Sequence, residues 1–106
     1  MTKEIKYLIR DVRPNSCGVA EVTGIPIQFA ALPDWEFFLR QSAAPTGGWI
    51  LTEVRSGGKF PTAFVESESE AVEWFEAFIA RQGAEKCSQA FNKALSQHGE
   101  LPKVPA

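Results

Sequence analysis

Residues 67–99 read SESEAVEWFEAFIARQGAEKCSQAFNKALSQHG, and this stretch decides the fold class because it predicts two consecutive helices. Ser67 and Glu70 have the spacing of a capping box, in which the serine hydroxyl accepts a hydrogen bond from a backbone amide of the first turn. Gly83 and Gly99 predict the helix ends, since glycine readily takes the positive φ of a C-cap. One helix that bends at Gly83 is the alternative, because an interior glycine costs only about 1 kcal/mol.

Side chains on both predicted helices recur every three or four residues, the spacing of one helix face. The two stripes run through Ala71, Phe75, Phe78, Ile79 and Gln82, and through Cys87, Ala90, Phe91, Ala94 and Leu95. We expect both stripes to pack on one face of a sheet. The glutamates at 66, 68, 70, 73 and 76 then form a solvated face, with an acidic docking face for a basic partner as the alternative.

Upstream of the helices, the sequence predicts a small, mostly antiparallel sheet of four or five strands. Residues 3–13 fit both helical and strand spacing, and their β-branched and aromatic content favours a strand. Residues 19–22 and 25–29 predict two short strands around a turn at Thr23 and Gly24. Residues 49–54 and 60–65 flank a glycine-rich turn and predict a hairpin. Strands followed by helices indicate an α+β fold.

Residues 33–40 (PDWEFFLR) predict a short helix between these strands. Pro33 suits the first helical turn, where its missing N–H has no partner to lose. Trp35, Phe38 and Leu39 would then share one face of that helix, and Phe37 would fall off it.

Length and charge limit the organisation of the chain. Its 106 residues, 44% of them hydrophobic, predict a single domain over residues 1–99. Pro102 and Pro105 predict an extended tail over 100–106, because proline cannot continue a helix. Eleven Lys and Arg against thirteen Asp and Glu give a net charge of −2, which excludes a surface that is basic throughout. We therefore expect no nucleic-acid partner.

Cysteine usage and hydropathy bear on the compartment. The longest uncharged apolar run near the N-terminus, residues 7–9, is too short for a signal peptide or a membrane span, so we expect a cytoplasmic protein with no membrane partner. Cys17 and Cys87 lie too far apart for a zinc or redox motif. We expect thiols, with Cys87 in the core, and neither a metal nor a cofactor.

Aromatic residues provide the strongest functional hint, with eight Phe, three Trp and one Tyr. A helix over 33–40 cannot hide all of its rings, and surplus aromatic surface is typical of interfaces. The candidate site residues for a partner or ligand are Trp35, Phe37, Phe38, Trp49, Glu53 and Arg55. We expect a binding protein that forms a homodimer through the region 35–38 or through an edge strand.

Two alternatives to the homodimer stay open. The first is a pocket for a small apolar molecule between sheet and helices, with Glu53 or Arg55 orienting the guest; its walls would be Trp35, Phe38, Trp49 and Phe75. The second is a small enzyme in which Glu53 acts with His98 or Cys17 as acid and base.

The turn at residues 55–59 (RSGGK) has two cations around glycines, so it could hold a phosphate. It lacks the GxxxxGK[ST] pattern of a P-loop, however, and such a sequence is usually a plain hairpin turn.

The stretch WILTEVRSGG at 49–58, with its partner strand and the Ser/Glu-capped helix, resembles short uncharacterised proteins carried on mobile DNA such as plasmids, phages and integron gene cassettes. The likeness covers about residues 49–81 and concerns structure, not catalysis. The resemblance implies self-association and brings no site residues with it.

Overall fold

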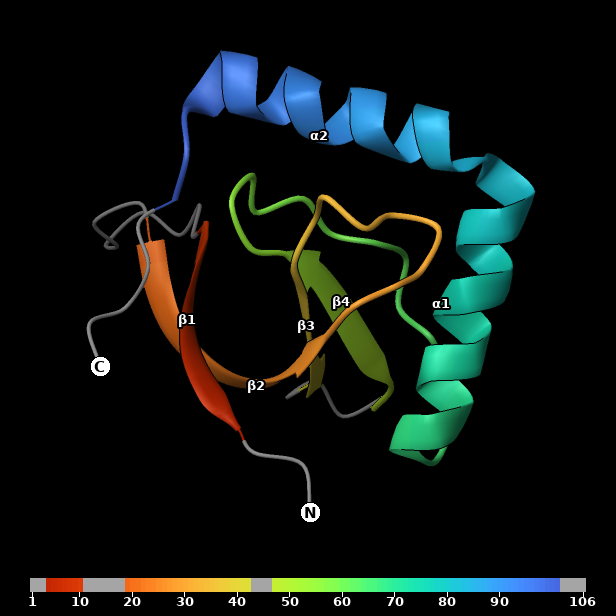
Figure 1. The fold of residues 1–106 in the computed structure, drawn as a ribbon. Helices are drawn as coiled ribbons and strands as arrows, with labels where there is room; N and C mark the ends of the chain where they lie inside the picture. The colour runs from red at the N-terminus through yellow and green to blue at the C-terminus, as the bar shows by residue number, and fades with distance from the viewer. Residues whose placement is uncertain (1–3, 11–18, 43–46, 102–106) are drawn as a thin grey trace.

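A computed structural model describes residues 4–10, 19–42 and 47–101. Four antiparallel strands lie in sequence order in one sheet and two helices follow them, which confirms the α+β class (Figure 1). The strands and helices are β1 (Ile5–Arg10), β2 (Val19–Ile27), β3 (Phe37–Gln41), β4 (Trp49–Glu53), α1 (Glu68–Gln82) and α2 (Ala84–His98). The predicted strand within residues 3–13 is therefore confirmed as β1.

Strand β2 is continuous, so the predicted turn at Thr23 and Gly24 is wrong. Residues 19–24 pair with β1, whereas residues 25–27 pair with β3. The strand changes partners at Gly24, where a Cβ atom would lie 2.6 Å from the Phe38 ring. Glycine is needed here because the backbone of residue 24 lies close to the Phe38 ring, and not because the chain turns. Within the described residues, Pro26 lies where β2 pairs with β3 and no longer with β1, as expected for a residue that cannot donate to a ladder.

The predicted helix over residues 33–40 is also wrong, because residues 37–41 form strand β3. Phe37, Phe38 and Leu39 are all almost fully buried, although consecutive strand residues point to opposite faces. Both faces of β3 are therefore covered. A run of apolar residues with no alternation gave no strand signal in the sequence.

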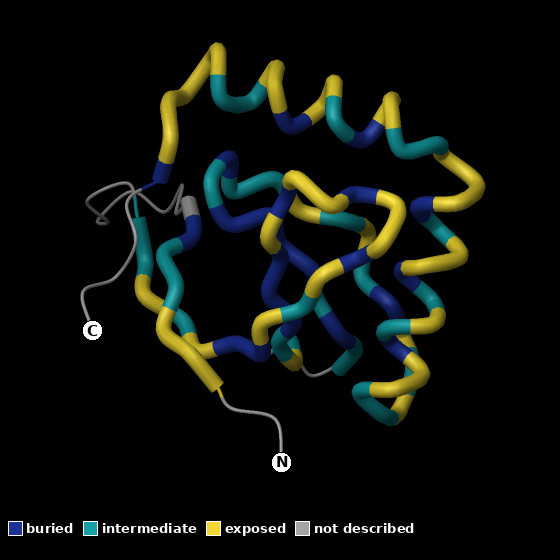
Figure 2. Tube along the Cα trace, viewed as in Figure 1, coloured by how far each residue is buried: buried dark blue, intermediate teal, exposed yellow. Residues whose placement is uncertain are grey.

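Both helices pack on one face of the sheet, as predicted, and Figure 2 shows their buried positions turned inward. The Ser67 hydroxyl accepts a hydrogen bond from the Glu70 amide at 3.2 Å, which confirms the N-cap. Gly83, with φ of 90°, ends α1 and precedes α2, so the two helices are separate. The buried residues of the two stripes are Ala71, Phe75, Ile79, Cys87 and Phe91.

The predicted hairpin after β4 forms only in part. Residues 59–63 return beside β4 through bridges that join Thr52 to Lys59 and Trp49 to Ala63, without making a regular strand. The predicted tail begins packed, since Leu101 is buried and its amide donates to the Arg55 carbonyl at 2.7 Å. Cys17 and residues 102–106 lie outside the described part of the chain.

The sheet face away from the helices has a second, smaller core. Ile9, Phe38 and Val54 are buried there, and Tyr7, Ala20 and Val22 pack against them. Because β2 bends at Gly24, the ribbon of β1 and β2 leans over this face (Figure 1). That arrangement positions the candidate site.

Candidate functional site

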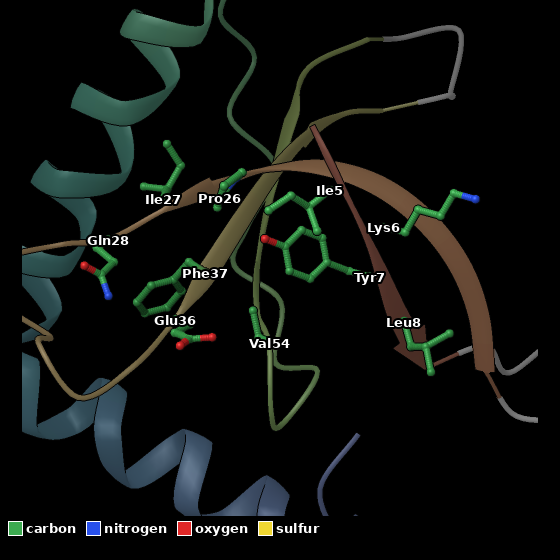
Figure 3. Close-up of a pocket in the computed structure, with 10 residues that line it drawn as sticks. All are labelled: Ile5, Lys6, Tyr7, Leu8, Pro26, Ile27, Gln28, Glu36, Phe37 and Val54. Carbon is green, nitrogen blue, oxygen red and sulfur yellow. The ribbon is translucent and has the colours of Figure 1, made fainter. Parts of the chain in front are cut away.

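A pocket of about 590 Å³ opens between β1, the end of β2 and the start of β3. Its walls are mainly apolar. The lining residues are Ile5, Lys6, Tyr7, Leu8, Pro26, Ile27, Gln28, Glu36, Phe37 and Val54. Figure 3 shows the Tyr7 ring in the middle of this group, with the Lys6 side chain turned away from it.

A stacked ring pair fixes one wall of the pocket. The rings of Tyr7 and Phe38 lie 4.2 Å apart and within 3° of parallel. Phe38 is fully buried, and Val54 beside it in the same cluster is 7% exposed. The half-buried Tyr7 ring therefore packs on buried side chains. This wall of the pocket is preformed in the absence of a ligand.

Two polar groups on this lining interact electrostatically. Burial raises the pKa of Tyr7 above its ordinary value, and the nearby negative charge of Glu36 raises it further. The phenol is therefore neutral at physiological pH and can both donate and accept a hydrogen bond. Glu36 is exposed at the rim, and its carbonyl accepts a backbone hydrogen bond from Val54 at 2.9 Å. The Gln28 amide adds a third polar group.

The structure buries the aromatic residues that the sequence singled out. Trp35, Phe37, Phe38 and Trp49 are each 8% exposed or less, so their rings are core residues and not a surplus surface. The Trp35 indole donates to the Ser88 hydroxyl at 3.2 Å and is thereby tied to α2. Of these four residues, Phe37 lines the pocket, and Phe38 stacks on the Tyr7 ring that lines it.

The space expected to be a pocket between sheet and helices is filled by packed rings. Phe91 of α2 lies 5.0 Å from Trp35 and 5.7 Å from Phe37, and Phe60 lies 5.9 Å from Phe75, as measured between ring centroids. These separations are those of packed aromatic pairs. The pocket that the structure contains lies at the edge of the other sheet face, so the predicted location between sheet and helices is wrong.

Glu53 organises the turn that follows β4. Its side chain is fully buried, and its two oxygens accept from the amides of Arg55 and Ser56, both at 2.8 Å. The Gly58 amide donates to the Ser56 hydroxyl at 3.1 Å. The amides that a phosphate would need are thus used inside the turn, and the phosphate hypothesis for residues 55–59 is wrong.

Arg55 and His98 also lie away from the pocket. The Arg55 guanidinium lies 4.7 Å from the centre of the Trp35 ring, a cation–π geometry. His98 is exposed at the end of α2, whereas Glu53 is buried and bonded to backbone amides. The carboxylate expected to pair with His98 is therefore already engaged inside the turn.

Tyr7, Gln28 and Glu36 are the site residues that sequence reasoning missed. The alternation of Ile5, Tyr7 and Ile9 marks one strand face, and the lone tyrosine on it was an available signal. The proximity of Tyr7 and Glu36 depends on the bend of β2, and no local sequence pattern predicts that bend.

The described residues hold no group of three His, Cys, Asp or Glu side chains suited to a metal ion. Neither of their helices has the length and apolar character needed to cross a bilayer. Cys87 is buried as predicted, and burial raises the pKa of its thiol.

No family model matches the chain, and no curated protein or solved structure was found to be similar to it. The resemblance to proteins of mobile DNA therefore stays a prediction.

Proposed function

We propose that this chain is a cytoplasmic binding protein for a small molecule with an apolar body and an amine. The observation that carries the proposal is the pocket of about 590 Å³, with apolar walls around the Tyr7 ring and the Glu36 carboxylate at its rim. Pockets that hold drug-sized ligands have volumes of about 300–1,000 Å³, mostly apolar linings and a few polar groups that orient the guest.

The charge of the lining favours a cation. Glu36 supplies a negative charge, and Lys6 is the one basic residue among the lining residues. The Lys6 ammonium lies 3.7 Å from a Glu21 carboxylate oxygen and points away from the pocket (Figure 3). An ammonium group held near Glu36 would gain from the low dielectric of the apolar walls.

Phenethylamine is a suitable probe, and phenethyl alcohol is its neutral counterpart of similar shape. We expect both to bind, as followed by calorimetry or by chemical shifts of the lining residues. Glu36→Gln should weaken the amine about fivefold, the equivalent of about 1 kcal/mol for a partly exposed charge pair, and should leave the alcohol unaffected.

Glu73→Gln provides the matched control, because Glu73 is exposed on α1 and does not line the pocket. It removes the same charge and should leave both affinities unchanged. Failure of both probes to bind, or an equal loss of amine affinity in the two variants, would contradict the proposal.

A homodimer formed through β1 is a second candidate function, favoured by an open sheet edge. Within the described residues, β1 pairs with β2 alone, whereas residues 59–63 accompany the far side of β4. Ile5 on β1 is 41% exposed. An exposed strand edge with an apolar side chain is a template for strand addition, here by the β1 of a second copy.

Light scattering tests the dimer directly. The expected mass is about twice the monomer mass of 11.7 kDa, and Ile5→Lys should shift the protein toward monomer because edge charges oppose strand pairing. Phe64→Lys is the control, since Phe64 is 69% exposed and does not belong to β1, the edge strand under test. A strict monomer at all concentrations would exclude this candidate.

A further inference from the structure

A second pocket, of about 370 Å³, lies where β2 changes partners. It is lined by Glu4, residues 22–25, residues 39–41 and Trp49. Arg40 of β3 stands between Leu39 and Gln41 in this lining and pairs with Ile50 of β4. The pocket differs in lining and in charge from the one around Tyr7.

Arg40 has an unsatisfied donor. Its Nε atom is buried and has no hydrogen-bond partner among the described residues. Within those residues, no carboxylate lies at ion-pair distance from its guanidinium. Burial lowers the pKa of Arg40 below its ordinary value. A buried donor that has no partner among the described residues is costly, and the rest of the Arg40 side chain is partly exposed, so an anion in this pocket would find an arginine charge that no described carboxylate pairs.

The geometry points to a small monocarboxylate as the ligand of this pocket, held by the Arg40 guanidinium. The planar fork of arginine suits the two oxygens of a carboxylate. Thr23 and Gln41 line the same pocket and offer further donors.

The other lining residues define the rest of the ligand. Ile25, Leu39 and Trp49 belong to the main core and are at most 9% exposed, so the apolar area that they offer suits only a small hydrocarbon group. Glu4, which is exposed at the rim, repels anions and disfavours a doubly charged phosphate more than a singly charged carboxylate.

The test is a titration with sodium benzoate, followed by NMR at the Nε–Hε signal of Arg40, against sodium chloride at matched ionic strength. We expect a saturable shift with benzoate and no comparable shift with chloride. Arg40→Gln should weaken benzoate binding at least tenfold, since a charge-assisted hydrogen bond is lost. Glu4→Gln should tighten it about twofold to threefold, as expected when an exposed like charge is removed.

Arg81→Gln is the matched control, because Arg81 is exposed in the last turn of α1. It should bind benzoate like the unaltered protein. Equal binding by the Arg40 and Arg81 variants would overturn the proposal, as would an Arg40 signal that responds alike to benzoate and chloride. Tighter binding of phosphate than of benzoate would overturn the ligand class. If Arg40→Gln does not fold, the comparison of benzoate with chloride on the unaltered protein still tests the proposal.

Discussion

Tyr7 is the single tyrosine of the chain, so its ionisation can be followed without interference. Burial and the negative charge of Glu36 raise its pKa above the ordinary value of 10.0. We predict that phenolate absorbance in the folded protein appears above that pH, and that the unfolded chain titrates near it. Glu36→Gln should bring the pKa of Tyr7 part of the way back, because burial remains.

The same shift sets the direction of a stability change with pH. The fold prefers the neutral phenol, so its contribution to the free energy of unfolding is complete below pH 10.0 and is lost as pH rises through the raised pKa. A Tyr7 pKa at or below the ordinary value in the folded protein would contradict the proposed surroundings of this residue.

Local signals predicted single residues well. Ser67, Gly83 and Gly99 mark helix ends in the structure as they do in the sequence, because capping depends on the few residues around each end. Cys87 was likewise placed correctly in the core from the spacing of its helix face. The role of Glu53 was missed, since a carboxylate that accepts from amides two and three residues later has no distinctive sequence pattern.

Strand β2 depends on Gly24, and this yields a prediction for the element. Gly24→Ala would place a methyl group 2.6 Å from the Phe38 ring, which is fully buried and stacked on Tyr7. We expect the substitution to lower the free energy of unfolding by about 1–3 kcal/mol, the usual cost of overpacking a core. Denaturant unfolding monitored by circular dichroism measures the change.

The matched comparison is the same substitution in a Phe38→Leu background, where the smaller side chain leaves space. The cost of Gly24→Ala should fall there, and a double-mutant cycle gives the coupling between the two positions. A neutral or stabilising effect of Gly24→Ala in the unaltered protein would show that the close approach at the bend is absent.

The two elements that sequence reasoning misread share one physical cause. A strand covered on one face alternates apolar and polar residues, but β3 is covered on both faces and resembles a helical run. The continuous β2 was divided at Gly24 because glycine usually signals a turn, whereas here it permits contact with Phe38. Each misreading depends on what packs from elsewhere in the chain, and no local pattern contains that information.

At the scale of the whole molecule, most aromatic residues lie in two clusters on opposite faces of the sheet, whereas Phe64 is exposed. The expectation of surplus ring surface assumed a short helix over residues 33–40, which could not have hidden all of its rings, whereas residues 37–41 form a strand that is covered on both faces. In the described part, the exposed large apolar residues are Ile5 and Phe64, and the rings of the region 35–38 are inside. The general fold class followed from the order of strands and helices, but the pocket is a product of the bent sheet and could not be predicted.

The most direct test of ligand binding in the bent sheet is the position of bound phenethylamine. Intermolecular nuclear Overhauser effects should connect its ring protons to the methyl groups of Ile5, Ile27 and Val54, which line the pocket. Effects confined to methyl groups outside this lining, such as those of Val65 or Leu95, would contradict the assignment of the site.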